Sequence, residues 1–401
     1  MSEFTNKKQN RVNALARFAH EMMVTTDKGK LVRENEKLIS QVIPSEVITL
    51  FDVLVNEHQN QNYPELKTAT NKILHLFHAP LMAYPAIKPA EDSFLDLLIR
   101  NNTAMENLLK SMKKAVKNMN QNPDDQETRQ QLKVKLGRLR LFDQHYQIKE
   151  NVLFPALETH WTDFHCVQLM WSYHDDIRRQ MKDLDAALNE PEFDLKKTNK
   201  LLGDLFFNLF AIRFREEHIL FPHILETIPQ EAIHQMLIDS QEIGFPYVSP
   251  EKPESVSTPV FTDGTTVNLG TGQLRAEQII GIFNHLPVDI TYVDEYDTVR
   301  FFSTPKKRIF PRTKAILGRQ VHNCHPPESV HIVEEIVSAF RKGEKDQASF
   351  WINFKSEKIL IQYFAMRNEQ GAYQGVIEVT QEIGDLQNLN GEKRLLDWSS
   401  E

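Results

Sequence analysis

The chain has 401 residues, a net charge of −8, 41% hydrophobic residues and 25% charged residues, a composition typical of an ordinary soluble protein with roughly two or three domains. The acidic surplus argues against nucleic-acid binding, and no run of about 18 apolar residues predicts a membrane span. Because the polar N-terminus lacks the apolar core of a signal peptide and the two cysteines cannot form a disulfide framework, we expect a cytoplasmic protein.

Residues 1–85 predict a small helical domain. Apolar residues recur at helical spacing, as at Val12, Leu15 and Ala16, and no segment carries a strand signal. Ser45 precedes an apolar face and suits a helix N-cap. Prolines at 80, 85 and 89 then interrupt the chain before the next helical block.

Residues 91–236 predict four long helices. Their apolar faces cover about 94–116, 132–153, 164–188 and 195–225. Pro123 and Pro191 lie in two of the breaks between them. Long helices joined by short loops are typical of an up-down four-helix bundle.

The composition changes after the bundle. Residues 244–273 are rich in Pro, Ser, Thr and Gly, and we expect a linker there, with 244–260 as its protease-sensitive part. Residues 274–385 then alternate β-branched and aromatic residues with polar ones, giving two strands, a helix and three further strands. This order predicts an α+β domain with a five-stranded antiparallel sheet, followed by a tail at 386–401. We expect residues 265–385 to fold alone.

The hexad Glu-x-x-Leu-Phe-Pro occurs twice, beginning at Glu150 and at Glu217. Two equivalent acids on paired helices suggest carboxylates that face a shared interior, which is how a bundle builds a metal site. His145 and His174 would add imidazole ligands suited to iron. We predict that His145, Glu150, His174 and Glu217 converge, with Glu216 as an extra carboxylate. The alternative is that these acids are solvated and the histidines belong to the core.

The repeat and its histidines resemble the hemerythrin-like family of cation-binding four-helix bundles over residues 91–236. The resemblance implies an iron site, but several positions where the family carries a ligand hold other residues: Asn102, Lys149, Met170, Arg178 and Ile212. It therefore implies a single or weakly bound iron, or an emptied site, rather than a full diiron centre.

The string GRQVHNCHPPESVHIV in the C-terminal domain places Cys324 beside His325. Cysteine and histidine are common axial ligands of heme, and an accessible thiol can respond to oxidants. The sequence therefore offers Cys324 and His325 as heme ligands or as a redox-sensitive pair. The alternative is a loop that only fills the edge of a pocket.

The strand and helix order resembles a PAS sensory domain. The strings FNHLPVDITYVDE and GEKRLLDW are similar to a bacterial family that joins a helical domain of unknown function, a hemerythrin-like bundle and a PAS domain. The resemblance implies sensing without naming a ligand. Our first hypothesis is a sensor or binding protein for oxygen, nitric oxide, redox state or iron that signals through a protein partner and can form a homo-oligomer through its PAS domain. Alternatives are an iron-dependent oxidoreductase or a metal-free scaffold, although no hydrolase or nucleotide-binding motif is present.

Overall fold

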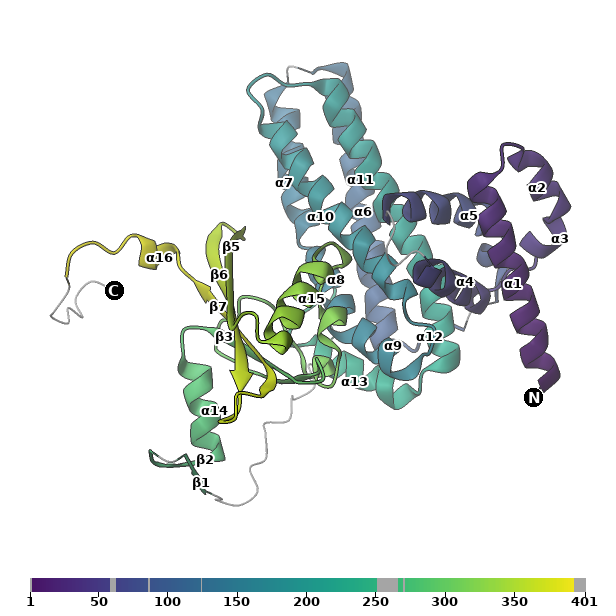
Figure 1. Cartoon of the computed structure of the whole chain (residues 1–401). Helices are drawn as coiled ribbons and strands as arrows, with labels where there is room; N and C mark the ends of the chain where they lie inside the picture. The colour runs from purple at the N-terminus through teal and green to yellow at the C-terminus, as the bar shows by residue number, and fades with distance from the viewer. Residues whose placement is uncertain are drawn as a thin grey trace. The chain divides into compact units, whose positions relative to one another are not determined.

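The computed structural model describes residues 2–57, 63–85, 87–123, 125–250, 266–269 and 271–392, with side chains from residue 9 onward. The chain divides into two compact units, residues 1–256 and 257–401 (Figure 1). Parts of the expected linker (251–265 and 270) and of the expected tail (393–401) lie outside the described residues.

The first unit begins with five helices. They are α1 (Ser2–Val24), α2 (Lys28–Glu34), α3 (Glu36–Ile39), α4 (Pro44–Glu57) and α5 (Tyr63–Ala83). Helix α5 continues past Pro80 because this proline lies in its last turn, where little helix remains to be disrupted. The apolar faces of these helices share one hydrophobic core with the bundle that follows.

The bundle is built from four helical runs. They are α6 (Phe94–Gln121); α7 (Gln126–Arg140) with α8 (Asp143–Ile148), η1 (Lys149–Leu153) and α9 (Phe154–His160); α10 (Cys166–Asn189); and α11 (Leu195–Arg215) with η2 (Glu216–Leu220) and α12 (Phe221–Thr227). Helices α6, α7, α10 and α11 lie side by side (Figure 1). Helix α13 (Gln230–Ser240) packs against α6 and η1. The side-chain oxygen of Asp194 accepts a hydrogen bond from the Lys197 amide at 2.9 Å and caps α11.

The repeated hexad produces the same local structure twice. Residues of η1 and η2 form π-helical turns, in which the amides of Phe154 and Phe221 bond to the carbonyls of Lys149 and Glu216, five residues earlier. The proline that follows each phenylalanine has no amide hydrogen, so the ordinary helical bond is lost at that point. Such wider turns occur often at functional sites because they re-aim the side chains around them.

The second unit contains a five-stranded antiparallel sheet of order β4-β3-β7-β6-β5. Its strands are β3 (Asp289–Asp294), β4 (Val299–Phe302), β5 (Gln347–Phe354), β6 (Glu357–Arg367) and β7 (Tyr373–Glu382). A separate hairpin pairs β1 (Thr266–Asn268) with β2 (Gln273–Arg275). The remaining helical elements are α14 (Ala276–His285), η3 (Lys314–Ile316), η4 (Val321–Cys324), α15 (Pro327–Lys342) and α16 (Gly384–Gln387).

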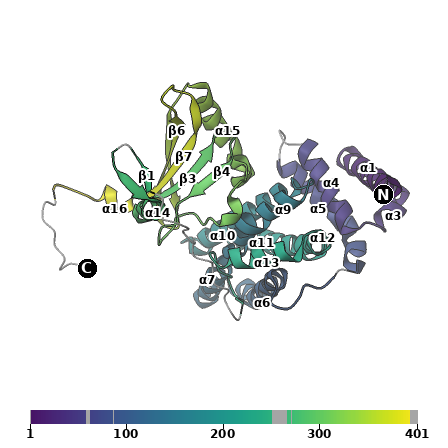
Figure 2. The ribbon, with the colours of Figure 1, turned by 90° about the horizontal axis from the view of Figure 1, so that it is seen from below.

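Helix α15 covers one face of this sheet (Figure 2). Val333, Val337 and Phe340 pack against Ile361 and Val376 from the central strands. Pro327 starts the helix, where its missing amide costs nothing, and a left-handed Gly343 ends it. The fold class predicted from the sequence, an all-α part followed by an α+β domain with a five-stranded antiparallel sheet, is confirmed. Among the described residues, every helix is too short or too polar to cross a bilayer.

Candidate functional site

Two buried carboxylates, Glu216 and Glu150, organise the interior of the bundle. The side chain of Glu216 is 1% exposed and that of Glu150 is 6% exposed. Burying an isolated carboxylate is costly, so each must be neutralised or paired. The structure pairs both with side-chain cations and histidines.

Glu216 is held by three side chains. The Lys149 ammonium donates to its Oε1 atom, and the Asn102 amide donates to Oε2 at 3.0 Å. The His145 Nε2 atom lies 3.3 Å from the same Oε2. All of these side chains are buried. Although burial alone would raise the pKa of Glu216, Lys149 and His145 lower it well below its usual value.

Glu150 is held mainly by Arg178. The guanidinium donates from Nη1 and Nη2 to the two carboxylate oxygens, each at 2.9 Å, and its Nε donates to Asp143 at 2.6 Å. Burial opposes the charge on Arg178, but Glu150 and Asp143 together raise its pKa well above its usual value. His174 Nδ1 lies 2.8 Å from the same carboxylate, and its ring stacks on Tyr146 with centroids 4.3 Å apart.

The structure brings together four of the five residues proposed as metal ligands: His145, Glu150, His174 and Glu216. The exception is Glu217, which is 15% exposed and accepts from Arg213 Nε at 2.9 Å. Their partners explain the difference: Arg178 of α10 holds the Glu150 carboxylate in the interior, whereas Arg213, one turn before Glu217 on the same helical run, holds the Glu217 carboxylate. A spacing of four residues keeps Lys149 on the same helix face as His145.

Sequence reasoning treated Lys149, Arg178 and Asn102 only as departures from a ligand pattern, yet all three bond to the buried acids. Lys149 lies four residues after His145, and Arg178 lies four residues after His174. This spacing puts each cation on the same helix face as its histidine, and it could have predicted both contacts. Tyr146 and Asp143 were missed altogether. Three buried atoms of this interior, His145 Nδ1, His174 Nε2 and the Tyr146 hydroxyl, have no hydrogen-bond partner in the described part of the chain.

These side chains do not fit a bound metal pair. A metal ion needs the carboxylates as free ligands, whereas an ammonium occupies Glu216 and a guanidinium takes both oxygens of Glu150. A third cation would be repelled by the two already there. In the described ranges, no three His, Cys, Asp or Glu side chains group closely enough to hold an ion.

The second unit has its own polar row on the sheet face that α15 covers, in which Thr291 and Tyr363 are buried and Glu378 is half-buried. Thr291, Glu378 and Tyr363 stand directly opposite one another across strands β3, β7 and β6. The Thr380 hydroxyl donates to Glu378 Oε1 at 3.3 Å. Burial, with the nearby Glu378 carboxylate, raises the pKa of Tyr363 well above its usual value. Glu378, an acid between the apolar residues Ile377 and Val379, was the sequence signal for this row.

The segment between β4 and α15 lies against the same polar row. Arg308 Nη2 lies 3.5 Å from the Thr291 hydroxyl, and its Nε lies 3.8 Å from Asp289. Arg312 also acts on Tyr363, because its positive charge opposes the rise in the Tyr363 pKa. The face therefore combines a carboxylate, hydroxyls and guanidinium groups.

Cys324 and His325, expected as a pair, contact different surroundings. Cys324 packs against the small apolar cluster of Val293, Val299 and Phe302. His325 Nδ1 bonds to the Val321 carbonyl at 2.9 Å, and burial lowers the pKa of the imidazole despite the nearby Glu378. Charged neighbours of this kind suit a small polar ligand better than the flat apolar face of heme.

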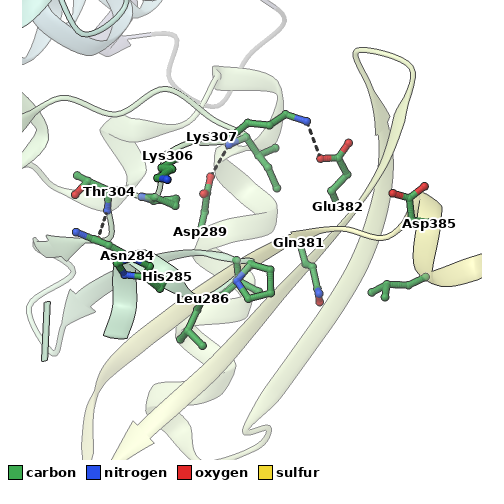
Figure 3. A pocket seen from close by; sticks show the side chains of 15 residues that line it. Asn284, His285, Leu286, Asp289, Thr304, Lys306, Lys307, Gln381, Glu382 and Asp385 are labelled. Carbon is green, nitrogen blue, oxygen red and sulfur yellow. Dashed lines mark hydrogen bonds and ion pairs between the residues drawn. The ribbon is translucent and has the colours of Figure 1, made fainter. Parts of the chain in front are cut away.

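An open groove of about 740 Å³ lies at one end of the sheet (Figure 3). Lys307 and Glu382 form an ion pair at 3.1 Å along it, and Asn284 accepts from the Thr304 amide at 2.7 Å. Asp289 accepts from the Ile309 amide at 2.8 Å. The polar groups of the groove are thus mostly used in bonds within the fold.

Comparison with known proteins finds one family model in each unit. A family model for the hemerythrin HHE cation-binding domain matches residues 93–224, and a PAS domain model matches residues 281–384. A crystal structure of a C-terminal domain from Streptococcus mutans is 31% identical, covering 32% of this chain and 98% of that chain with a TM-score of 0.31. The PAS domain of a protein from Colwellia psychrerythraea is 16% identical, covering 27% of this chain and 97% of that chain with a TM-score of 0.21. No curated protein matches. The chain therefore contains a hemerythrin HHE cation-binding domain and a C-terminal PAS domain.

Proposed function

We propose that this protein is a sensor or binding protein whose PAS domain takes a small polar molecule carrying both a cationic and an anionic group. The observation that carries the proposal is the row of Thr291, Glu378 and Tyr363 on the covered face of the sheet. Buried polar side chains on the inside of a small domain cost stability unless something satisfies them. A bound ligand would supply the hydrogen bonds that these side chains need.

The charges on this face suggest the class of ligand. Glu378 would accept from an ammonium or a similar donor, while Arg312 would bind a carboxylate. Tyr363 and Thr380 supply hydroxyls that can either donate or accept. Small amino acids and related zwitterions carry the matching pair of charges.

The sequence also led to the hypothesis of a sensor of oxygen, nitric oxide, redox state or iron, with an iron-dependent oxidoreductase as the alternative. Each of these uses of the bundle needs a metal among His145, Glu150, His174 and Glu216, and the cations bonded to the two acids oppose it. We therefore place the ligand in the PAS domain. The bundle then serves as a scaffold, and a protein partner would receive the signal.

A thermal-shift experiment on the full chain tests the proposal. A panel of free amino acids and small carboxylates should contain compounds that raise the melting temperature of the wild-type protein by several degrees. Glu378→Gln should abolish the shift, because it removes the carboxylate of this row. Glu382→Gln, at the end of the same strand, is the matched control and should keep the response. A panel without any stabilising compound, or an equal response from Glu378→Gln, would contradict the proposal.

A further inference from the structure

The two carboxylates inside the bundle already have their counter-charges. Lys149 and Arg178 contribute two positive charges, and Glu216 and Glu150 contribute two negative ones. Lys149 is fully buried, and its ammonium also lies 4.6 Å from the Tyr146 ring centroid. The interior is thus close to neutral without any added ion.

The internal repeat shows how this arrangement is built. Lys149 and Glu216 are the first residues of the two π-helical turns, each one position before its copy of the hexad. The fold therefore places a carboxylate from one half of the repeat opposite an ammonium from the other. Two acids at these positions would repel each other in a dry interior and would need a cation between them.

We propose that Lys149 and Arg178 are built-in replacements for the cations of a cation-binding domain, and that the bundle is stable without metal because Lys149 bonds to Glu216. A single change, Lys149→Glu, would then create a need for a divalent transition-metal ion, with His145, His174 and Glu216 as the remaining ligands. Imidazole and carboxylate groups suit Mn²⁺, Fe²⁺ and Zn²⁺. The inference concerns the first unit alone and does not depend on the PAS ligand.

The test compares three full-length proteins: wild type, Lys149→Glu and the control Lys114→Glu. Lys114 is exposed on α6, so its substitution makes the same change in charge outside the interior. Each protein is stripped of metal and then titrated with Mn²⁺, with Zn²⁺, and with Fe²⁺ under anaerobic conditions. Bound metal is measured after dialysis, and the melting temperature is measured with and without the ion.

Wild type and Lys114→Glu should retain almost no metal and show no change in melting temperature. Lys149→Glu should be less stable than both, bind metal, and recover about 5 °C or more on saturation. Adding His174→Ala to Lys149→Glu should remove this recovery. That loss would show that the ion occupies the bundle interior.

Two results would overturn the inference. One is wild-type protein that binds one or more ions per chain and loses them on His174→Ala. The other is folded Lys149→Glu that neither binds metal nor responds to it. If Lys149→Glu does not fold with or without metal, the wild-type titration still decides between a built-in cation and a bound one.

Discussion

Lys149 and Glu216 come from the two halves of an internal repeat and meet as an ion pair with side chains 0% and 1% exposed. A pair this deeply buried contributes little net stability compared with apolar residues, but breaking it leaves an uncompensated charge. The stability of the bundle therefore depends on keeping both partners or removing both.

Lys149→Met should destabilise the chain by about 3–5 kcal/mol, because Glu216 then remains buried and ionised. The double variant Lys149→Met with Glu216→Gln should lose less, about 2 kcal/mol or below, since no charge is left alone. Urea denaturation of the single and double variants measures both values. If the loss of stability in the double variant equals the sum of the losses from the separate substitutions, Lys149 and Glu216 do not stabilise each other.

Arg178→Met should cost about 3 kcal/mol or more, because both hydrogen bonds to the buried Glu150 disappear. Asp143→Asn is the comparison. It weakens the other side of the same guanidinium, but the Asp143 side chain is 30% exposed and water can replace the bond. A loss of about 1 kcal/mol or less is expected there. Equal losses in the two variants would mean that Glu150 does not depend on Arg178.

The bundle should lose stability in mild acid. Burial, followed by the charge on Lys149, lowers the pKa of His145 to about 4 from a usual value of 6.5, and burial also lowers the pKa of His174. Between pH 6.5 and pH 4 these two imidazoles bind more protons in the unfolded chain than in the folded one, so the stability that they contribute is complete above pH 6.5 and falls as the pH is lowered.

The slope of this loss should approach about 1.4 kcal/mol per pH unit for each buried histidine. Urea denaturation at a series of pH values measures it. His174→Phe should reduce the slope, whereas the same change at the exposed His160 should leave it unaltered. A flat stability profile across this range would mean that neither imidazole is buried in its neutral form.

Gly375→Ala should disrupt the PAS sheet. Gly375 has a φ angle of +124°, and a Cβ atom there would lie 2.1 Å from the Val293 carbonyl oxygen of the neighbouring strand. The expected cost is about 3 kcal/mol, which would accelerate amide hydrogen exchange in β3 and β7 by about 100-fold. Gly281→Ala in α14 meets no atom within 4 Å, and exchange in the sheet should not change. Normal amide protection in Gly375→Ala would show that β3 and β7 accommodate the added Cβ atom without loss of stability.

Much of the fold follows from local patterns in the sequence. Apolar residues at helical spacing defined the four bundle helices, and alternation along 358–367 and 373–381 defined the central strands β6 and β7. The repeated Leu-Phe-Pro also marked where both π-helical turns form, since each proline removes the same helical hydrogen bond. These features depend on residues that are close together in the sequence, so the sequence alone predicts them.

Only the tertiary structure decided which charged residues meet. The sequence makes Glu150 and Glu217 equivalent, but Arg178 reaches one and Arg213 the other, and Glu216 takes the interior position instead. Likewise, Thr291 and Tyr363 flank Glu378 only because β7 lies between β3 and β6, an order that local alternation does not specify. Ion pairs and cross-strand neighbours depend on which elements pack together, and that packing is set by the burial of apolar surface over the whole unit.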